Sequence, residues 1–149
     1  MEQRFETFTT QISKISRCIR KIKTAEMAEF DLKSPHVSCL YYLYKNSSGL
    51  TAKELCGLCE EDKGAVSRAI GYLEDEGYIQ CESKTEKRYK SPLSLTEKGN
   101  RVGEKIALKV DHVLELASPG LSSKERESFY QTLTYISNNL QKICDEYGD

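Results

Sequence analysis

No segment of the chain carries an apolar run long enough to cross a bilayer, which excludes a protein that spans the membrane with helices. The opening residues, MEQRFETF, lack the pattern of a signal peptide, so we expect a cytoplasmic protein with no membrane partner. A nucleophile–base pair, a phosphate-binding glycine loop and paired acidic residues are also missing, and the two histidines are isolated from each other in the sequence. We therefore expect no enzyme activity, no cofactor and no metal.

The chain also lacks an excess of charge of either sign. Its net charge of -1 does not by itself indicate a nucleic-acid partner, but the charges are unevenly distributed. Between Glu82 and Arg101 six basic residues stand against three acidic ones, whereas from Asp111 to the end three basic residues stand against seven acidic ones. A nearly neutral protein with a basic middle can still place one face on phosphate. The length of 149 residues suits one compact domain with a hydrophobic core.

Six cysteines are present, and without a secretory signal they do not indicate a disulfide framework. Cys56 and Cys59 form a C-x-x-C motif, which can be half of a zinc site or a redox pair. A zinc site would need two more ligands, and the other cysteines and histidines follow at no recognisable spacing. We favour thiols that pack as small apolar side chains, while a thiol-based redox sensor using Cys56 and Cys59 stays an alternative.

Two apolar stripes at the chain ends predict long amphipathic helices. The N-terminal stripe has spacings of three and four residues and consists of Phe5, Phe8, Ile12, Ile15, Ile19 and Ile22. The C-terminal stripe has the same spacings and consists of Phe129, Leu133, Ile136, Leu140, Ile143 and Tyr147. Ser122 opens the last helix with a capping box, and Thr96 caps a third amphipathic helix before it. Heptad spacing at both ends favours a bundle shared by two subunits, with a bundle inside one chain as the alternative.

The middle of the chain predicts a compact series of short elements. Ser34 and Pro35 are typical of a helix start, as cap and first helical residue, before an apolar helix over 37–44. Thr51 opens a short helix with another capping box, and Asp62 caps a further helix that ends at Gly77. Extended runs at 78–81 and 93–95 flank a polar, basic loop over 82–91. This order predicts a helix-turn-helix followed by a hairpin wing.

The second helix of such a motif must present small or polar residues at its N-terminal end, so that it can enter the major groove. That end contains the predicted DNA-contacting residues Lys63, Gly64, Ala65, Ser67 and Arg68. The wing adds Lys84, Lys87, Arg88 and Lys90, which suit phosphates or a minor groove. The competing interpretations are an Arg68 that only pairs with Glu61 or Asp75, and a basic loop that is simply solvated.

Three short patterns in Leu55–Gly99 resemble the DNA-binding core of the MarR family. They are D-K-x-x-V-S-R at 62–68, L-E-x-x-G-Y-I at 73–79 and L-T-E-x-G at 95–99. Each is weak alone, but their order and spacing are specific, and the flanking helices fit the family's dimerisation region. The resemblance implies a mainly α fold with a small β-wing, in which a winged helix-turn-helix occupies residues 34–97. Residues 1–33 and 98–149 would then form a helical dimerisation region from both termini.

The same resemblance implies a homodimeric regulator, often a repressor, on a pseudo-palindromic operator in duplex DNA. It also implies release of DNA by a small effector, often aromatic, or by oxidation of a cysteine. Arg88 matches the wing arginine of the family, with Glu86 in place of the usual aspartate. One extra residue before Thr96, and Pro92 in the returning strand, depart from the family pattern.

An effector pocket is predicted at the aromatic cluster where the helical and DNA-binding regions meet. Its candidate residues are His36, Tyr41 and Tyr44, although tyrosines on a half-buried helix are more often simply packed. A last alternative is a winged helix that binds a protein instead of DNA, which the acidic residues 60–62 beside the recognition helix support slightly.

Overall fold

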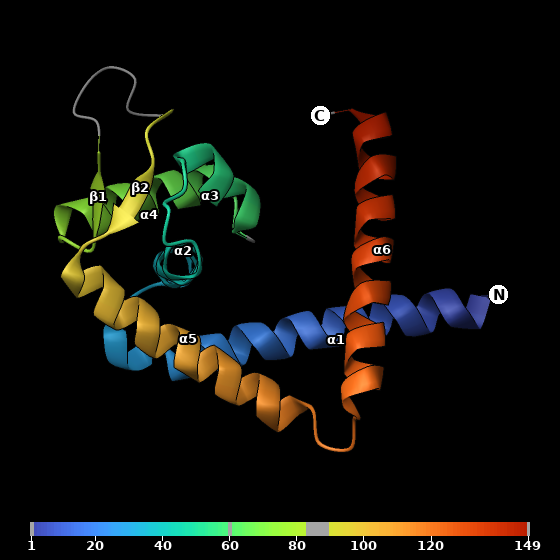
Figure 1. Cartoon of the computed structure of the whole chain (residues 1–149). Helices are drawn as coiled ribbons and strands as arrows, with labels where there is room; N and C mark the ends of the chain where they lie inside the picture. The colour runs from blue at the N-terminus through green and yellow to red at the C-terminus, as the bar shows by residue number, and fades with distance from the viewer. Residues whose placement is uncertain (1, 60, 83–89, 149) are drawn as a thin grey trace. The chain divides into compact units, whose positions relative to one another are not determined.

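A computed structural model describes residues 2–59, 61–82 and 90–148 of the chain. In chain order the described elements are α1 (Glu2–Glu26), the 3-10 helix η1 (Ala28–Phe30), α2 (Ser34–Lys45), α3 (Ala52–Leu58), α4 (Lys63–Asp75), β1 (Ile79–Cys81), β2 (Leu93–Leu95), α5 (Glu97–Ala117) and α6 (Ser123–Tyr147) (Figure 1). The predicted fold class, mainly α with a small β-wing, is confirmed. No described helix has the length and apolar character needed to cross a membrane.

The chain divides into two compact units, residues 1–110 and 111–149. The division falls inside α5, so α1 belongs to the same unit as the helix-turn-helix and the hairpin. The predicted grouping of residues 1–33 with 98–149 as a dimerisation region stays a prediction.

Side-chain caps begin most of the predicted helices where the sequence placed them. Thr51 Oγ1 accepts a hydrogen bond from the Glu54 amide at 3.2 Å, and Ser122 Oγ accepts one from the Glu125 amide at the same distance. Asp62 Oδ1 accepts from the Ala65 amide at 2.9 Å and Thr96 Oγ1 from the Gly99 amide at 3.1 Å. These four predicted caps are confirmed, because each satisfies an amide that has no partner inside its helix.

The predicted cap of the apolar helix was wrong by one residue. Helix α2 begins at Ser34 itself, and Lys33 is its N-cap residue. The Lys33 amide donates to His36 Nδ1 at 3.1 Å, so the imidazole takes the role that a glutamate three residues after the cap has in a capping box. The Ser34 hydroxyl instead donates to Glu61 Oε1 at 2.7 Å, a partner 27 residues away that local spacing does not reveal.

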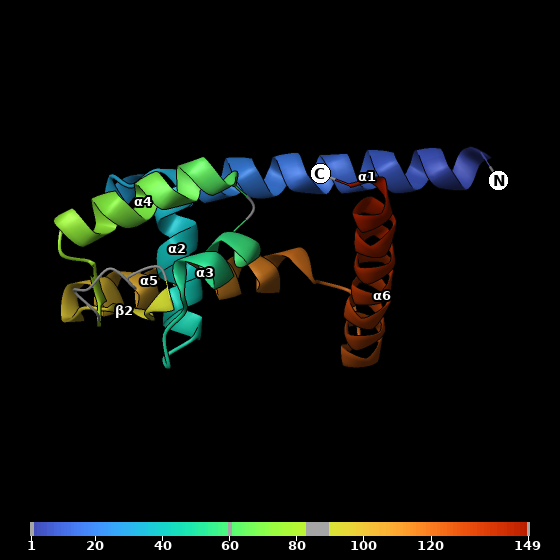
Figure 2. The same cartoon turned by 90° about the horizontal axis from the view of Figure 1, so that it is seen from above.

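The hydrophobic core lies where α2, α3 and α4 meet. Figure 1 shows α2 nearly end-on with α3 and α4 beside it, and Figure 2 shows α2 from the side. Fully buried side chains come from all three helices and from α5: Leu40, Leu55, Val66, Leu73 and Ile106. Burying a side chain of this kind contributes about 1.5–3 kcal/mol, so these helices hold one another in a fixed arrangement.

The hairpin follows α4 directly. Gly77 has a φ of 77°, a left-handed conformation that suits glycine and ends the helix. Strands β1 and β2 are antiparallel, with Ile79 opposite Leu95 and Cys81 opposite Leu93. The predicted extended runs are confirmed, with β1 starting one residue later than expected. Pro92 directly precedes β2 and so takes no position in the ladder, which corrects its predicted place inside the returning strand.

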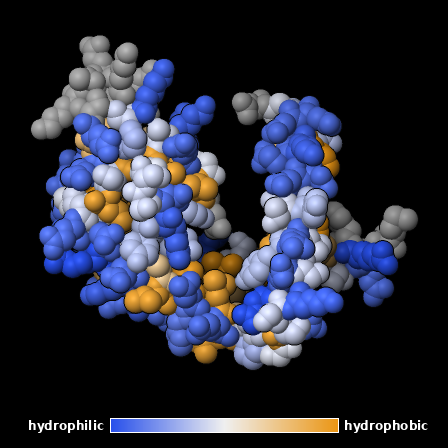
Figure 3. Space-filling model, viewed as in Figure 1, coloured by the Kyte–Doolittle hydropathy of each residue, from blue (hydrophilic) through white to orange (hydrophobic). Residues whose placement is uncertain are grey.

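The long helices α1 and α6 carry the two apolar stripes, and much of each stripe is exposed in the single chain. On α1 the stripe residues from Phe8 to Ile22 are 37–52% exposed. On α6, Phe129, Leu140 and Ile143 are 47–52% exposed. Helix α5 also presents apolar side chains, because Leu108 and Leu116 are exposed. Figure 3 shows orange, hydrophobic areas on the surface of the chain. Amphipathic helices of this kind need a partner surface to bury their apolar face.

Candidate nucleic-acid interface

One face of α4 is anchored in the core and the opposite face is open. Val66 and Leu73 are fully buried and Ala69 is nearly so. Lys63, Gly64, Ser67 and Arg68 are exposed, and Ala65 is half-buried. The structure therefore brings all five predicted residues of this helix together at its N-terminal end. Such an end also carries the positive pole of the helix dipole, which favours contact with phosphate.

Gly64 leaves room for the Arg68 side chain. A Cβ atom added at Gly64 would lie 3.2 Å from Arg68 Nη1 and 3.2 Å from Asp62 Oδ1. The guanidinium group therefore lies over the first turn of α4, beside the residue that caps the helix. A larger residue at position 64 would displace it from this turn.

The competing interpretation of Arg68 as an ion-pair partner of Glu61 is not what the structure shows. Glu61 Oε1 lies 3.7 Å from Lys23 Nζ and accepts from the Ser34 hydroxyl. Among the described residues no ion pair of Arg68 is present. A contact of Arg68 with DNA stays a prediction.

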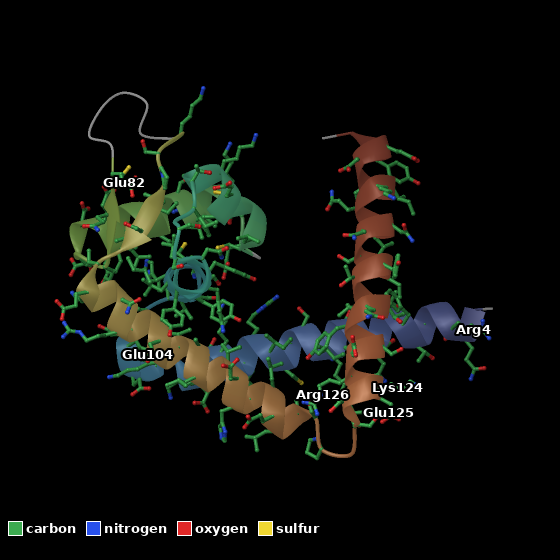
Figure 4. The ribbon with its side chains drawn as sticks, in the orientation of Figure 1. Arg4, Glu82, Glu104, Lys124, Glu125 and Arg126 are labelled. Atoms are coloured by element: carbon green, nitrogen blue, oxygen red, sulfur yellow. The ribbon has the colours of Figure 1, made fainter. Side chains whose placement is uncertain are left out.

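Most of the predicted wing residues lie outside the described residues. This applies to Lys84, Lys87 and Arg88, and their contacts stay predictions. Glu82, labelled in Figure 4, is the last residue described after β1, and Lys90 is exposed on the other side of the gap. The paired strands β1 and β2, which precede and follow these residues in the sequence, are described.

Lys98 has a role at the base of the wing that the sequence did not indicate. Its Nζ donates to the Glu76 carbonyl at 2.8 Å, where α4 ends, and lies 4.1 Å from the centre of the Tyr78 ring. The Thr96 hydroxyl donates to the Gly77 carbonyl at 2.6 Å. Together these contacts join the start of α5 to the end of α4, so the hairpin leaves α4 in a defined direction. The only local signal was a lysine in the first turn of a helix, which is common on solvated surfaces.

The three predicted pocket residues have different neighbours. The His36 ring stacks on Tyr72 of α4, with ring centres 4.4 Å apart. Tyr41 contacts Tyr42 edge to face, and the Cβ of Tyr44 packs against Gly103 of α5. Burial, with a smaller effect of the nearby Lys33 charge, lowers the pKa of His36. These contacts explain the three side chains by packing, and an effector pocket formed by them stays a prediction.

Cys59 lies beside a third thiol that the spacing did not reveal, Cys39 of α2. The hydrogen bond between these two thiols and the burial of Cys39 raise the pKa of Cys39, and burial likewise raises that of Cys56. A raised pKa keeps a thiol protonated at neutral pH, and a protonated thiol is a poor nucleophile and a poor metal ligand. No group of histidine, cysteine or acidic residues in the described ranges is arranged to hold a metal ion. The geometry favours the packing interpretation of Cys56 and Cys59.

Comparisons with known proteins agree with this geometry. The model of the MarR family matches residues 30–88. The HTH-type transcriptional regulator YybA of Bacillus subtilis is 27% identical over 132 residues, which cover 89% of this chain and 87% of that protein. A second HTH-type regulator of the same organism, YwoH, is 28% identical over 119 residues, covering 80% of this chain and 85% of its own.

Solved structures show the same fold at lower identity. The MepR–DNA complex of S. aureus has a TM-score of 0.75 and 21% identity, with 89% of this chain and 96% of that chain covered. The MarR protein of S. aureus in complex with salicylate and kanamycin has a TM-score of 0.79 and 18% identity, with 95% of both chains covered.

Proposed function

Because the chain belongs to the MarR family of winged helix-turn-helix proteins, we propose that it is a transcription regulator that binds duplex DNA as a homodimer. One observation carries the proposal: the first two turns of α4 present Lys63, Ser67 and Arg68 to solvent while Val66 and Leu73 hold the helix in the core. A helix fixed on one side and polar on the other can enter a major groove without losing its position.

In the proposed complex each subunit places α4 in one major groove. Two-fold symmetry then sets two half-sites roughly one helical turn apart, so the operator is pseudo-palindromic. Arg68 reads a base edge, and the lysines of α4 and the wing contact phosphates. Phosphate contacts release counterions, and binding therefore weakens as salt rises.

The homodimer in this proposal is formed by the terminal helices. Support comes from the exposed stripes of α1 and α6, whose three-and-four spacing is typical of helices that pack on other helices. A monomer would leave those side chains in water, whereas a second copy would cover them.

The proposal extends to a repressor in the cytoplasm that releases DNA on binding a small aromatic effector. Its support is a protein of the same fold that was solved in complex with salicylate and kanamycin. The chemistry of the described site is recognition rather than catalysis, and the family consists of transcription regulators.

Fluorescence anisotropy tests the proposal. The probe is the DNA upstream of the protein's own gene, binding is measured at two salt concentrations, and random DNA is the competitor. Arg68→Ala should weaken operator binding by about 1–3 kcal/mol, the value of one bidentate base contact. Arg126→Ala is the matched control, because Arg126 is exposed on α6 and is not one of the residues proposed to contact DNA.

Unchanged operator affinity in Arg68→Ala would remove Arg68 from the recognition surface. If the unaltered protein does not discriminate that DNA from random sequence, selection against the whole genome is the next step. Failure there too would favour the alternative of a winged helix that binds a protein partner.

A further inference from the structure

Glu61 joins three elements at the entrance to the recognition helix. It directly precedes Asp62, which caps α4, and its side chain points back toward α2 and α1. Oε1 accepts from the Ser34 hydroxyl at 2.7 Å and from the Ser38 hydroxyl at 3.5 Å. The same oxygen lies 3.7 Å from Lys23 Nζ, near the end of α1.

Lys23 closes the network from the other side. Its ammonium group donates a hydrogen bond to the Ser38 hydroxyl as well as pairing with Glu61. The side chains of Lys23 and Glu61 are only 24% and 19% exposed, so the pair is largely shielded from water. A shielded, hydrogen-bonded pair holds its geometry better than an ion pair on an open surface, where solvent competes for both charges.

Stability alone does not account for this arrangement. The second carboxylate oxygen, Glu61 Oε2, is buried and has no hydrogen-bond partner among the described residues. Removing a carboxylate oxygen from water without a partner is costly, and a pair of well-packed apolar side chains is often at least as stable as a buried ion pair. The network is therefore better explained by the orientation that it imposes than by the free energy that it adds to folding.

We propose that Glu61 is a positioning residue for DNA recognition: together with Lys23 it fixes the N-terminal end of α4 to the C-terminal end of α1. One peptide bond separates Glu61 from Asp62, whose carboxylate holds the Ala65 amide. A displacement of Glu61 therefore reaches the first two turns of α4, which carry Lys63, Ser67 and Arg68. Because α1 also carries the N-terminal stripe, the contact transmits the orientation of that helix to the reading face. The inference rests on the proposed function and assigns that function a further residue.

Hydrogen–deuterium exchange of the full-length protein tests the positioning without DNA. The variants are Lys23→Met, Glu61→Gln and the double variant. In all three, the hydrogen-bonded amides of residues 65–67 should exchange about tenfold faster, while the amides of the buried part of α2 should not change. Lys109→Met is the matched control, because Lys109 of α5 pairs with Glu26 at the end of α1 and with Glu29 of η1, and neither of these ion pairs involves α4.

A second readout separates positioning from plain stabilisation. The ratio of operator to random-DNA affinity should fall roughly tenfold in the double variant, while binding to random DNA matches that of the unaltered protein, because the double variant keeps the same net charge. A Lys23→Met/Glu61→Leu variant replaces the ion pair by two apolar side chains. Its thermal midpoint should stay at or above that of the unaltered protein, and its discrimination between operator and random DNA should still fall.

Unchanged exchange at residues 65–67 in every variant would overturn the proposal, whatever the DNA results. A lower thermal midpoint with full discrimination would also overturn it, because Glu61 would then only stabilise the fold. If the unaltered protein selects no DNA, the proposed function fails, and the exchange data still decide whether Glu61 positions α4.

Discussion

The core of the helix-turn-helix and the two terminal helices have the same amphipathic spacing. The apolar faces of the core helices are buried, whereas those of the terminal helices are largely exposed. In the core, Leu40, Leu55 and Leu73 are fully buried, because the apolar faces of α2, α3 and α4 meet one another. On α1 and α6, apolar residues at least as large, such as Ile19 and Phe129, are each 52% exposed. One region completes its packing within a chain, and the other presents a surface that a single chain leaves open.

The difference shows that an amphipathic pattern predicts a buried face but not what buries it. Three short helices with tight turns can surround one another, so their faces converge within residues 34–75. A 25-residue helix such as α1 carries its stripe over many turns, and one chain offers no equally long partner in the same described unit. A second copy of the chain supplies one by symmetry.

The largest expected effect comes from placing charge in the N-terminal stripe. Ile15→Asp with Ile19→Asp puts four carboxylates into the proposed dimer, two from each subunit. Their burial should cost at least about 4 kcal/mol, roughly a thousandfold in the dimer dissociation constant. Sedimentation velocity should show a monomer, and circular dichroism should show that the helix-turn-helix core remains folded.

The control for that experiment is Thr10→Asp with Ser13→Asp, which adds the same charge to exposed positions outside the stripe. It should remain a dimer. If the stripe variant also sediments as a dimer, the terminal helices are covered within one chain and the contrast between the two regions disappears.

A smaller effect, on the free energy of unfolding, tests how tightly the start of α5 packs against the hairpin. A methyl group at Gly99 would overlap the Tyr78 carbonyl oxygen and lie 2.9 Å from its carbon, so backbone would have to move. Gly99→Ala should lower the free energy of unfolding by about 3 kcal/mol. A methyl group at Gly71 meets nothing within 4 Å, and Gly71→Ala should raise it by up to about 1 kcal/mol through helix propensity.

Urea unfolding of the two glycine variants measures both changes. Equal stability of Gly99→Ala and the unaltered protein would mean that the start of α5 is free to move away from the hairpin. The base of the wing would then not be held by the contacts of Lys98 and Thr96.

The smallest expected effect is the contribution of His36 to the pH dependence of the free energy of unfolding. Its pKa is lowered by burial and by Lys33, so the folded protein favours the neutral ring. As pH falls below about 6.5, the unfolded chain takes up the proton first, and stability is lost until the folded pKa is passed. Protonation of Nδ1 also removes the acceptor of the Lys33 amide. The loss should be below about 1 kcal/mol, the value of one partly exposed hydrogen bond.

Comparing urea unfolding at pH 7.5 and 5.5 with that of His36→Phe isolates this contribution. The phenylalanine ring keeps a stack on Tyr72 but cannot titrate, and His112 is present in both proteins. The same pH dependence in both proteins would assign the effect to other groups.

The helices and their ends could largely be predicted from the sequence, because the residues that specify them lie close together in the chain. The caps at Thr51, Asp62, Thr96 and Ser122 involve residues three apart, and the end of α4 at Gly77 needs only a left-handed backbone. The polar first turn of α4 and its buried opposite face follow from helical periodicity. Such features depend on one or two turns of chain, which spacing describes completely.

The contacts that join distant segments could not be predicted in the same way. Lys23, Ser34 and Glu61 are spread over 38 residues, yet they meet in one network. Cys39 lies beside Cys59, and Lys98 reaches back to the end of α4. Periodicity states which face of a helix turns inward, but the residue that it meets there depends on how three or four helices pack at once. Propensities and hydrogen bonds within a few residues therefore specified the elements of this protein, while the burial of shared apolar surface selected the partners of its charged and polar side chains.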